Sequence, residues 1–169
     1  MKMHLPKYPR ILGIAVSKYG LGYAVMKDVN VLFDWGVKWV RKDRDRACLA
    51  KVKRLMAHYE PHIVALEDTL AKGSLRPARI RNLTRRIVFL VKSCKVAPAI
   101  FSRQEMKRAY FPGGEATRHN LAMLMAERFA DDIGHLLPPK RKAWMVEHPR
   151  LAMFDAVALA SMVRLSWRK

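Results

Sequence analysis

Two carboxylates stand among apolar residues in this chain. Glu67 follows the run Ile63–Leu66, and Asp155 interrupts the apolar run that extends from Leu151 to Ala160. Burying an ionised carboxylate is costly unless a cation, a metal ion or hydrogen bonds compensate for the lost water. Carboxylate oxygens are also the ligands that hard divalent cations such as Mg²⁺ prefer. Both acids are therefore candidate functional residues; the alternatives for Asp155 are an arginine partner or an exposed position on its helix.

Three further acidic or imidazole side chains lie near these two along the chain. His148 precedes Asp155 by about two helical turns and returns to nearly the same helix face. Glu147 is its neighbour, but Pro149 predicts that both residues come before the regular helix, where capping or contact with solvent is the favoured role. Asp68 directly follows the strand's glutamate and, if the strand continues, its side chain points to the opposite face.

The amino-terminal part of the chain has the residue pattern of β-strands. Segments 11–16, 22–26 and 31–40 are apolar, β-branched or aromatic and are separated by turn-prone residues, which predicts three consecutive antiparallel strands. Asp34 falls in the third strand, and the pattern leaves its face open. A helical period follows and ends at Pro61.

The rest of the chain alternates strands with helices. Residues 63–66 predict a central strand buried on both faces, so Glu67 lies at its carboxyl end, where open α/β sheets carry their sites. Residues 96–101 predict a strand that tolerates Pro98 only at a sheet edge. Helices are expected over 80–94, over 103–110, from Thr117 to Phe129 and from Pro149 to about Leu165, with a loop over 136–145. The sum is a mixed α/β sheet flanked by helices, in one domain over residues 1–169.

The charge of the chain indicates a polyanionic partner. Thirty-three lysines and arginines against 14 acids give a net charge of +19, and no acid occurs between Asp68 and Glu105. Nucleic acid is the expected partner, although a solvated basic face is the general alternative. The residues expected to contact phosphates are Lys72, Arg76, Arg79, Arg81, Arg85, Arg86, Lys140, Arg141 and Lys142. Trp144 is available either to stack on a base or to anchor its loop.

Membrane and disulfide-rich classes are disfavoured. No apolar run reaches the roughly 18–20 residues that span a bilayer, and the apolar stripe of the basic second helix is needed for the core, which argues against coating an anionic membrane. Cys48 and Cys94 fall in predicted helices among apolar neighbours, and we expect buried, reduced thiols. These features favour a cytoplasmic protein.

Three segments together resemble a known family. The string Ile11-Leu-Gly-Ile-Ala-Val-Ser-Lys-Tyr-Gly-Leu-Gly-Tyr-Ala-Val25 resembles the opening motif of the RuvC-type Holliday-junction resolvases, which have a ribonuclease H-like fold. Ile63-Val-Ala-Leu-Glu67 resembles the strand that carries the family's catalytic glutamate, and Phe154-Asp-Ala-Val-Ala-Leu-Ala160 resembles the helix that closes the site. The order and spacing of the segments agree over most of the chain.

The resemblance implies a nuclease site in which clustered carboxylates hold two Mg²⁺ or Mn²⁺ ions. Glu67 and Asp155 would be catalytic metal ligands, and Glu147 and His148 are candidates to replace missing ones. The resemblance also suggests a homodimer.

Two positions depart from the family pattern. Ala15 stands where the family has its first-strand aspartate, and Ala152 stands where an acid or histidine is expected. An alanine methyl group cannot bind a metal ion, so we expect a nucleic-acid-binding relative of Mg²⁺-dependent structure-specific endonucleases with weak or absent activity. The alternatives are an active branched-DNA endonuclease with substitute ligands and a non-catalytic component of a nucleoprotein complex.

Overall fold

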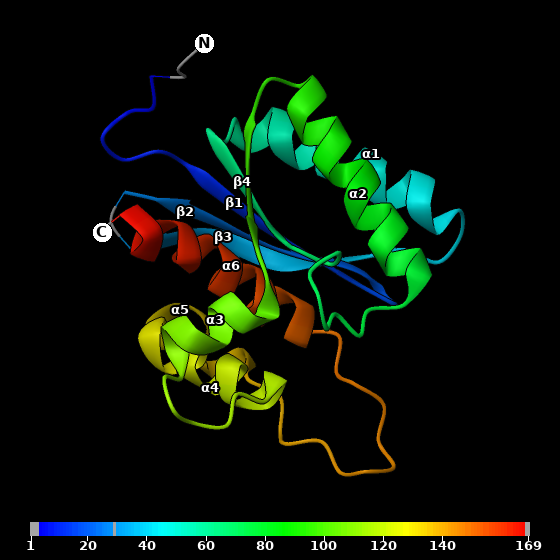
Figure 1. Ribbon diagram of the computed structural model, residues 1–169, viewed down its shortest axis with the longest axis vertical. Helices are drawn as coiled ribbons and strands as arrows, with labels where there is room; N and C mark the ends of the chain where they lie inside the picture. Colours follow the sequence, from blue (N-terminus) through cyan, green and yellow to red (C-terminus); the bar gives the residue numbers. More distant parts are fainter. Residues whose placement is uncertain (1–3, 29, 168–169) are drawn as a thin grey trace.

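A five-stranded mixed sheet forms the centre of the protein (Figure 1). The computed structural model describes residues 4–28 and 30–167. The strands are arranged in the order β3-β2-β1-β4-β5. The first three pair antiparallel, and β4 and β5 run parallel to β1. Their bounds are β1 Ile11–Ser17, β2 Gly20–Lys27, β3 Val31–Trp39, β4 Ile63–Glu67 and β5 Ala97–Phe101.

Helices cover both faces of this sheet. Helices α1 (Arg44–Tyr59) and α2 (Ala78–Ser93) pack on one face. Helix α6 (Leu151–Trp167) lies along the other face, and the smaller helices gather around it (Figure 1). These are α3 Arg103–Tyr110, α4 Arg118–Arg128 and α5 Ala130–Ile133, followed by a short 3₁₀ turn over Gly134–Leu136.

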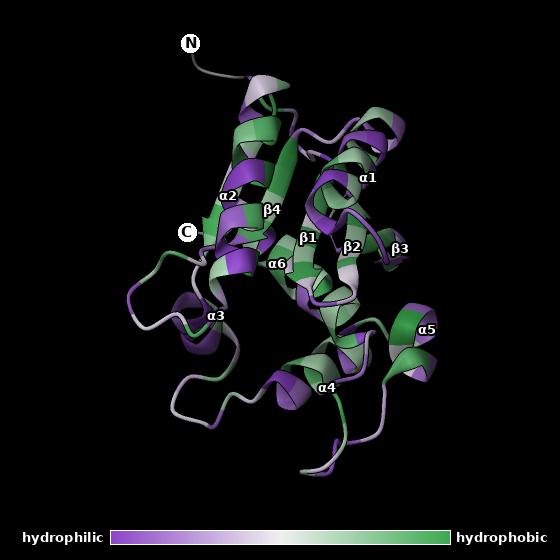
Figure 2. Cartoon of the chain, turned by 90° about the vertical axis from the view of Figure 1, so that its right-hand side faces the viewer, coloured by the Kyte–Doolittle hydropathy of each residue, from purple (hydrophilic) through white to green (hydrophobic). Residues whose placement is uncertain are grey.

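The two faces of the sheet build two apolar cores. Leu12, Ile14 and Leu66 point toward α1 and α2, whereas Ile11 and Ala65 point toward α6, as the alternation of side chains along strands requires. Helices α1 and α2 accordingly alternate hydrophobic residues toward the sheet with hydrophilic residues toward solvent (Figure 2). Helix α6 differs, because residues 151–164 are all buried.

Helix α6 approaches the sheet unusually closely. A Cβ atom at Gly22 would lie 2.2 Å from the carbonyl carbon of Ala152, and one at Gly13 would lie 2.1 Å from the carbonyl oxygen of Ala156. Only glycine in the strands permits this approach, since a larger residue would overlap the helix backbone. The contact fixes Ala152 against β2 at 1% exposure and thereby sets where Asp155 lies.

The predicted fold class is confirmed, with two local corrections. Pro98 lies in β5, which is an edge strand as expected. The central strand is β1 rather than β4, which lies between β1 and β5. Cys48 is buried, but Cys94 is exposed. The reason is that α2 ends at Ser93, so Cys94 lies after the last helical residue, and the chain leaves the helix through Lys95 at φ 58°. No helix in the described part of the chain is both long and apolar enough to cross a bilayer.

Candidate functional site

Glu67 and Asp155 converge on one arginine. Glu67 is the last residue of β4, and the alternation that points Ile63 and Ala65 toward α6 carries it to the same face. Arg103 joins the two acids: its Nε lies 2.7 Å from Oε1 of Glu67, and its Nη2 lies 3.4 Å from Oδ2 of Asp155. The side chains of Glu67 and Asp155 are only 10% and 4% exposed. The sequence-based expectation that these two carboxylates approach each other agrees with this geometry.

Two further arginines complete the cluster. Arg76 donates from Nε at 2.8 Å and from Nη2 at 2.7 Å to Oε2 of Glu67. Arg118 donates from Nε at 2.8 Å and from Nη2 at 2.6 Å to Oδ2 of Asp155, and its Nη1 pairs with Glu147. We call Arg76, Arg103 and Arg118 the arginine cluster. With the acids that they bind, these arginines form a chain in which arginines and carboxylates alternate.

Each arginine of the cluster stands at the start of a helix. Arg103 is the first residue of α3, behind the capping box that Ser102 forms with Glu105. Arg118 is the first residue of α4, behind Thr117, whose hydroxyl accepts from Asn120 N. Arg76 immediately precedes the N-cap of α2. Helix amino ends carry partial positive charge, so cations placed there need anionic neighbours.

The charges in the cluster stabilise one another. Burial alone would raise the pKa of Asp155, but the Arg118 and Arg103 guanidinium groups hold it below its usual value. Burial alone would lower the pKa of Arg118, but the Asp155 and Glu147 carboxylates raise it. The pKa of Arg103 is raised in the same way, against burial, by Asp155 and Glu67. Both arginines therefore stay cationic and Asp155 stays anionic.

A cleft of about 520 Å³ opens above this cluster. Its walls are the β4–α2 loop, the start of α3 and the residues before α4. The charged residues that line it are five basic and two acidic, namely Lys72, Arg76, Arg103, Lys107 and Arg118 against Glu67 and Asp68. Positive charge therefore exceeds negative charge at the carboxyl end of β4, and the cleft favours an anionic ligand.

The donor set does not fit a two-ion nuclease site. Ile14 pairs with Leu66, so the next residue, Ala15, is level with Glu67 on the α6 face and presents a methyl group. Ala152 is held against β2. Among residues 4–28 and 30–167, no three His, Cys, Asp or Glu side chains gather as a metal site requires. Instead, guanidinium groups bind both carboxylate oxygens of Glu67 and Oδ2 of Asp155.

The other candidate ligands have different surroundings. Glu147 binds Arg118, and its carbonyl accepts from the Tyr19 hydroxyl at 3.1 Å. His148 is exposed and precedes α6; its Nδ1 accepts from Arg150 N at 3.2 Å. Asp68 lines the cleft and accepts from Leu70 N at 3.1 Å.

Asp34 is remote from the cleft. It accepts hydrogen bonds from the hydroxyl groups of Tyr23 and Tyr59 on the α1 side of the sheet, and from Trp35 N.

The basic residues expected to contact phosphates fall into three groups. Lys72 and Arg76 line the cleft. On α2, Arg79 and Arg86 each lie 3.6 Å from Asp45, whereas Arg81 and Arg85 are exposed without an acidic partner in the described residues. Lys140, Arg141 and Lys142 are exposed in the loop before α6. There the Lys142 Nζ lies 5.2 Å from the ring centre of Trp144, which is 79% exposed and thus no packing anchor.

Sequence reasoning did not single out Arg103, Lys107 or Arg118 as site residues. A local signal existed for two of them, because Arg103 and Arg118 each follow a helix N-cap. An arginine at that position, behind Ser102 or Thr117, adds positive charge where acidic residues are favoured. That unfavourable placement points to an anionic partner from elsewhere in the chain.

Comparisons with solved structures identify the fold. RuvC from Thermus thermophilus superposes with a TM-score of 0.67 at 17% identity, covering 94% of this chain and 95% of that one. The same protein in complex with a Holliday junction substrate gives 0.65 at 17% identity, with 95% of each chain covered. The yeast mitochondrial Holliday junction resolvase Ydc2 gives 0.55 at 14% identity, covering 92% of this chain and 78% of that one.

Sequence comparison alone finds no such likeness. No protein-family model and no curated protein sequence matches the chain. The resemblance expected from the three sequence segments is nevertheless confirmed at the level of the fold. The chain has the RuvC-like, ribonuclease H-like fold of the Holliday junction resolvases.

Proposed function

We propose that this protein binds branched or duplex DNA in the cleft at the end of β4 and cleaves it weakly or not at all. The observation that carries the proposal is the arginine cluster, which places positive charge where a RuvC-type nuclease would need metal-binding carboxylates. Guanidinium groups bind phosphate oxygens in a fork geometry. A cleft lined by five basic residues can therefore hold a nucleic-acid backbone without a metal ion.

The basic surface around the cleft supports a backbone contact longer than one phosphate. Lys72 lies at the rim of the cleft, and the exposed Arg81 extends the positive surface onto α2. Contacts of this type supply affinity and salt dependence but do not read sequence. RuvC from T. thermophilus, which shares this fold, has been solved in complex with a Holliday junction substrate. A four-way DNA junction is therefore the first ligand to test.

Weak or absent cleavage follows from the proposed role of the carboxylates. Two-ion phosphodiester hydrolysis requires oxygen ligands that hold both ions beside the scissile phosphate. Ala15 contributes none, and both carboxylate oxygens of Glu67 and Oδ2 of Asp155 are bound by arginines. Mg²⁺ or Mn²⁺ binding to Glu67 and Asp155, with help from Glu147 or His148, belongs to the alternative of an active endonuclease.

Two measurements on the full chain test the proposal. Labelled four-way junction, duplex DNA and RNA are incubated with the protein in EDTA, Mg²⁺ or Mn²⁺, and both binding and cleavage are measured. We expect junction or duplex DNA to bind in EDTA with little or no cleavage in either metal. Cleavage that Glu67→Gln abolishes would establish the active endonuclease instead. A strong preference for RNA would favour the alternative of a nucleoprotein component.

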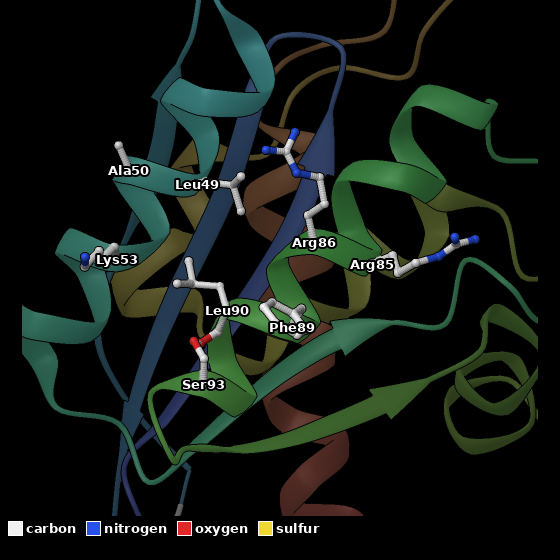
Figure 3. A pocket seen from close by; sticks show the side chains of 8 residues that line it. All are labelled: Leu49, Ala50, Lys53, Arg85, Arg86, Phe89, Leu90 and Ser93. Carbon is white, nitrogen blue, oxygen red and sulfur yellow. The ribbon is translucent and has the colours of Figure 1, made fainter.

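A homodimer is a second element of the proposal. A hollow of about 570 Å³ lies between α1 and α2, with Leu49 and Leu90 on its facing sides and Phe89 projecting at 76% exposure (Figure 3). The same surface thus carries a large apolar projection and an apolar hollow. A two-fold interface needs this self-complementarity, because each copy must present both halves of the contact.

The oligomeric state tests this element separately. Light scattering coupled to gel filtration is expected to give a dimer for the wild type and a monomer for Phe89→Asp. Leu75→Asp is the matched control, because Leu75 is 97% exposed on a loop away from the hollow. A monomeric wild type, or a Phe89→Asp variant that stays dimeric, would exclude an interface at this hollow.

A further inference from the structure

The geometry points to a reversed role for the two carboxylates: Glu67 and Asp155 are positioning residues that hold Arg76 and Arg103 of the arginine cluster in place to bind a nucleic-acid phosphate directly. This inference rests on the proposed function, since it concerns how the same cleft binds DNA. It differs from the role of carboxylates in a metal-dependent nuclease, where the acids hold the ions that contact the phosphate. Here the arginines contact the phosphate and the acids orient the arginines.

The hydrogen bonds of Arg76 and Arg103 divide each of these two guanidinium groups into a side that binds carboxylates and a side that does not. Arg76 and Arg103 each use Nε and Nη2 to reach the carboxylates. Their Nη1 groups make no hydrogen bond to any residue in the described part of the chain. Both side chains line the cleft. Two fixed donor groups are therefore left for an anion, which is what a phosphate oxygen requires.

Burial supports the same division of roles. The Glu67 and Asp155 side chains are 10% and 4% exposed, whereas Arg103, which bridges them, is 38% exposed. A ligand in the cleft consequently meets the guanidinium group before it meets either carboxylate. Arg118 is anchored more deeply, between Asp155 and Glu147, and helps to fix Asp155 rather than to contact the ligand.

The inference predicts the sign of a charge effect. Removing a negative charge near bound DNA ordinarily strengthens binding, because the carboxylate repels phosphates. If Glu67 orients the arginines, removing its charge releases the Arg76 side chain, which binding must then immobilise, while Asp155 still holds Arg103. We expect Glu67→Gln to bind a four-way DNA junction about three- to tenfold more weakly than the wild type, the range that ordering one long side chain produces.

The matched control is Asp68→Asn. Asp68 is the next residue and lines the same cleft, but its carboxylate forms no ion pair within residues 4–28 and 30–167, and its contact with Leu70 N survives in asparagine. The two variants change the net charge equally. We expect Asp68→Asn to bind the junction as tightly as the wild type or more tightly.

A second variant tests the guanidinium fork without touching an acid. Arg103→Lys keeps the charge on a partly exposed side chain but loses the fixed fork, so we expect binding to weaken about threefold or more. Affinities are measured by fluorescence anisotropy in EDTA at constant ionic strength, after thermal melting has shown that each variant is folded. Adding Mg²⁺ at the same ionic strength is expected to leave the wild-type affinity unchanged.

The outcomes separate the inference from the proposed function. A wild type that binds neither junction, duplex nor RNA contradicts both. A wild type that binds, together with Glu67→Gln and Arg103→Lys variants that bind equally well or better, contradicts the inference alone. If Glu67→Gln does not fold, undiminished binding by Arg103→Lys is enough to overturn it.

Discussion

Carboxylates on opposite faces of the sheet accept hydrogen bonds from different kinds of donor. On the α1 face, Asp34 accepts from the hydroxyl groups of Tyr23 and Tyr59 and from a backbone N–H. On the α6 face, the side chains of Glu67 and Asp155 accept, among the described residues, from the arginine cluster alone. Neutral donors leave the local charge negative, whereas the three guanidinium groups balance the carboxylates they bind, so that Lys72 and Lys107 give the cleft its excess positive charge. The first arrangement joins β2, β3 and α1, and the second forms the proposed anion site.

The largest expected effect comes from removing one arginine of the arginine cluster. Arg118→Met leaves Asp155 buried with only the 3.4 Å contact to Arg103, and removing one partner of a buried pair is expected to lower the free energy of unfolding by about 3 kcal/mol. Urea unfolding at pH 7 measures it. In the double variant with Asp155→Asn, which removes the buried unpaired charge, part of the loss should be recovered. A loss below about 1 kcal/mol for Arg118→Met alone would contradict a tightly coupled pair.

Acid should weaken the ion pairs that Asp155 forms with Arg103 and Arg118. The arginines lower the pKa of Asp155 below its usual value, so the folded state binds a proton less readily than the unfolded state does. Its stabilising contribution is therefore complete above the unfolded value, near 3.9, and is lost as the pH falls through the lower folded value. Between about pH 5 and pH 3, we expect unfolding of Asp155→Asn to depend less steeply on pH than that of the wild type. Parallel curves would contradict the lowered pKa.

The hydrogen bonds that Asp34 accepts from Tyr23 and Tyr59 should affect stability but not DNA binding. Tyr59→Phe removes a hydroxyl donor from Asp34 and is expected to lower the free energy of unfolding by about 1–2 kcal/mol. Junction affinity should stay at the wild-type value, because Asp34 lies on the α1 side and is not part of the cleft lining. A matching loss of affinity would show that the two faces are coupled.

The contact between Tyr59 and Asp34 should also be visible in the titration of tyrosine at alkaline pH. Burial and the hydrogen bond to Asp34 raise the pKa of Tyr59 to about 12. The neutral hydroxyl is thus favoured in the folded state, and its contribution to stability is complete below about pH 10 and lost as the pH rises toward 12. Absorbance of ionised tyrosine, compared between the wild type and Tyr59→Phe, should show one fewer group titrating near pH 12. A difference already present near pH 10 would contradict the contact.

Local patterns were sufficient to predict the strands and the helices, and the resemblance implied that Glu67 and Asp155 lie close together. Apolar alternation and helical periods depend on neighbouring residues, and the resemblance supplied the topology. The arginine partners could not be predicted, because Arg103 and Arg118 reach acids that lie far away along the chain. The reason for Ala152 was also hidden, since it lies in the close contact of α6 with Gly22. Cys94 was misplaced because a helix end is set by a single residue's backbone conformation.

The smallest effect we predict distinguishes paired from unpaired arginines on α2. Arg81 has no acidic partner in the described residues, whereas Arg79 lies 3.6 Å from Asp45. If Arg81 contacts a phosphate, Arg81→Gln should reduce the slope of log affinity against log salt concentration by about 1, since each phosphate contact releases roughly one counterion. Arg79→Gln should change the slope less, because its charge is already partly neutralised. Anisotropy titrations of the DNA junction at several salt concentrations measure both slopes. Equal changes in the two variants would mean that Asp45 does not withhold Arg79 from the DNA, and that pairing with carboxylates matters only inside the cleft.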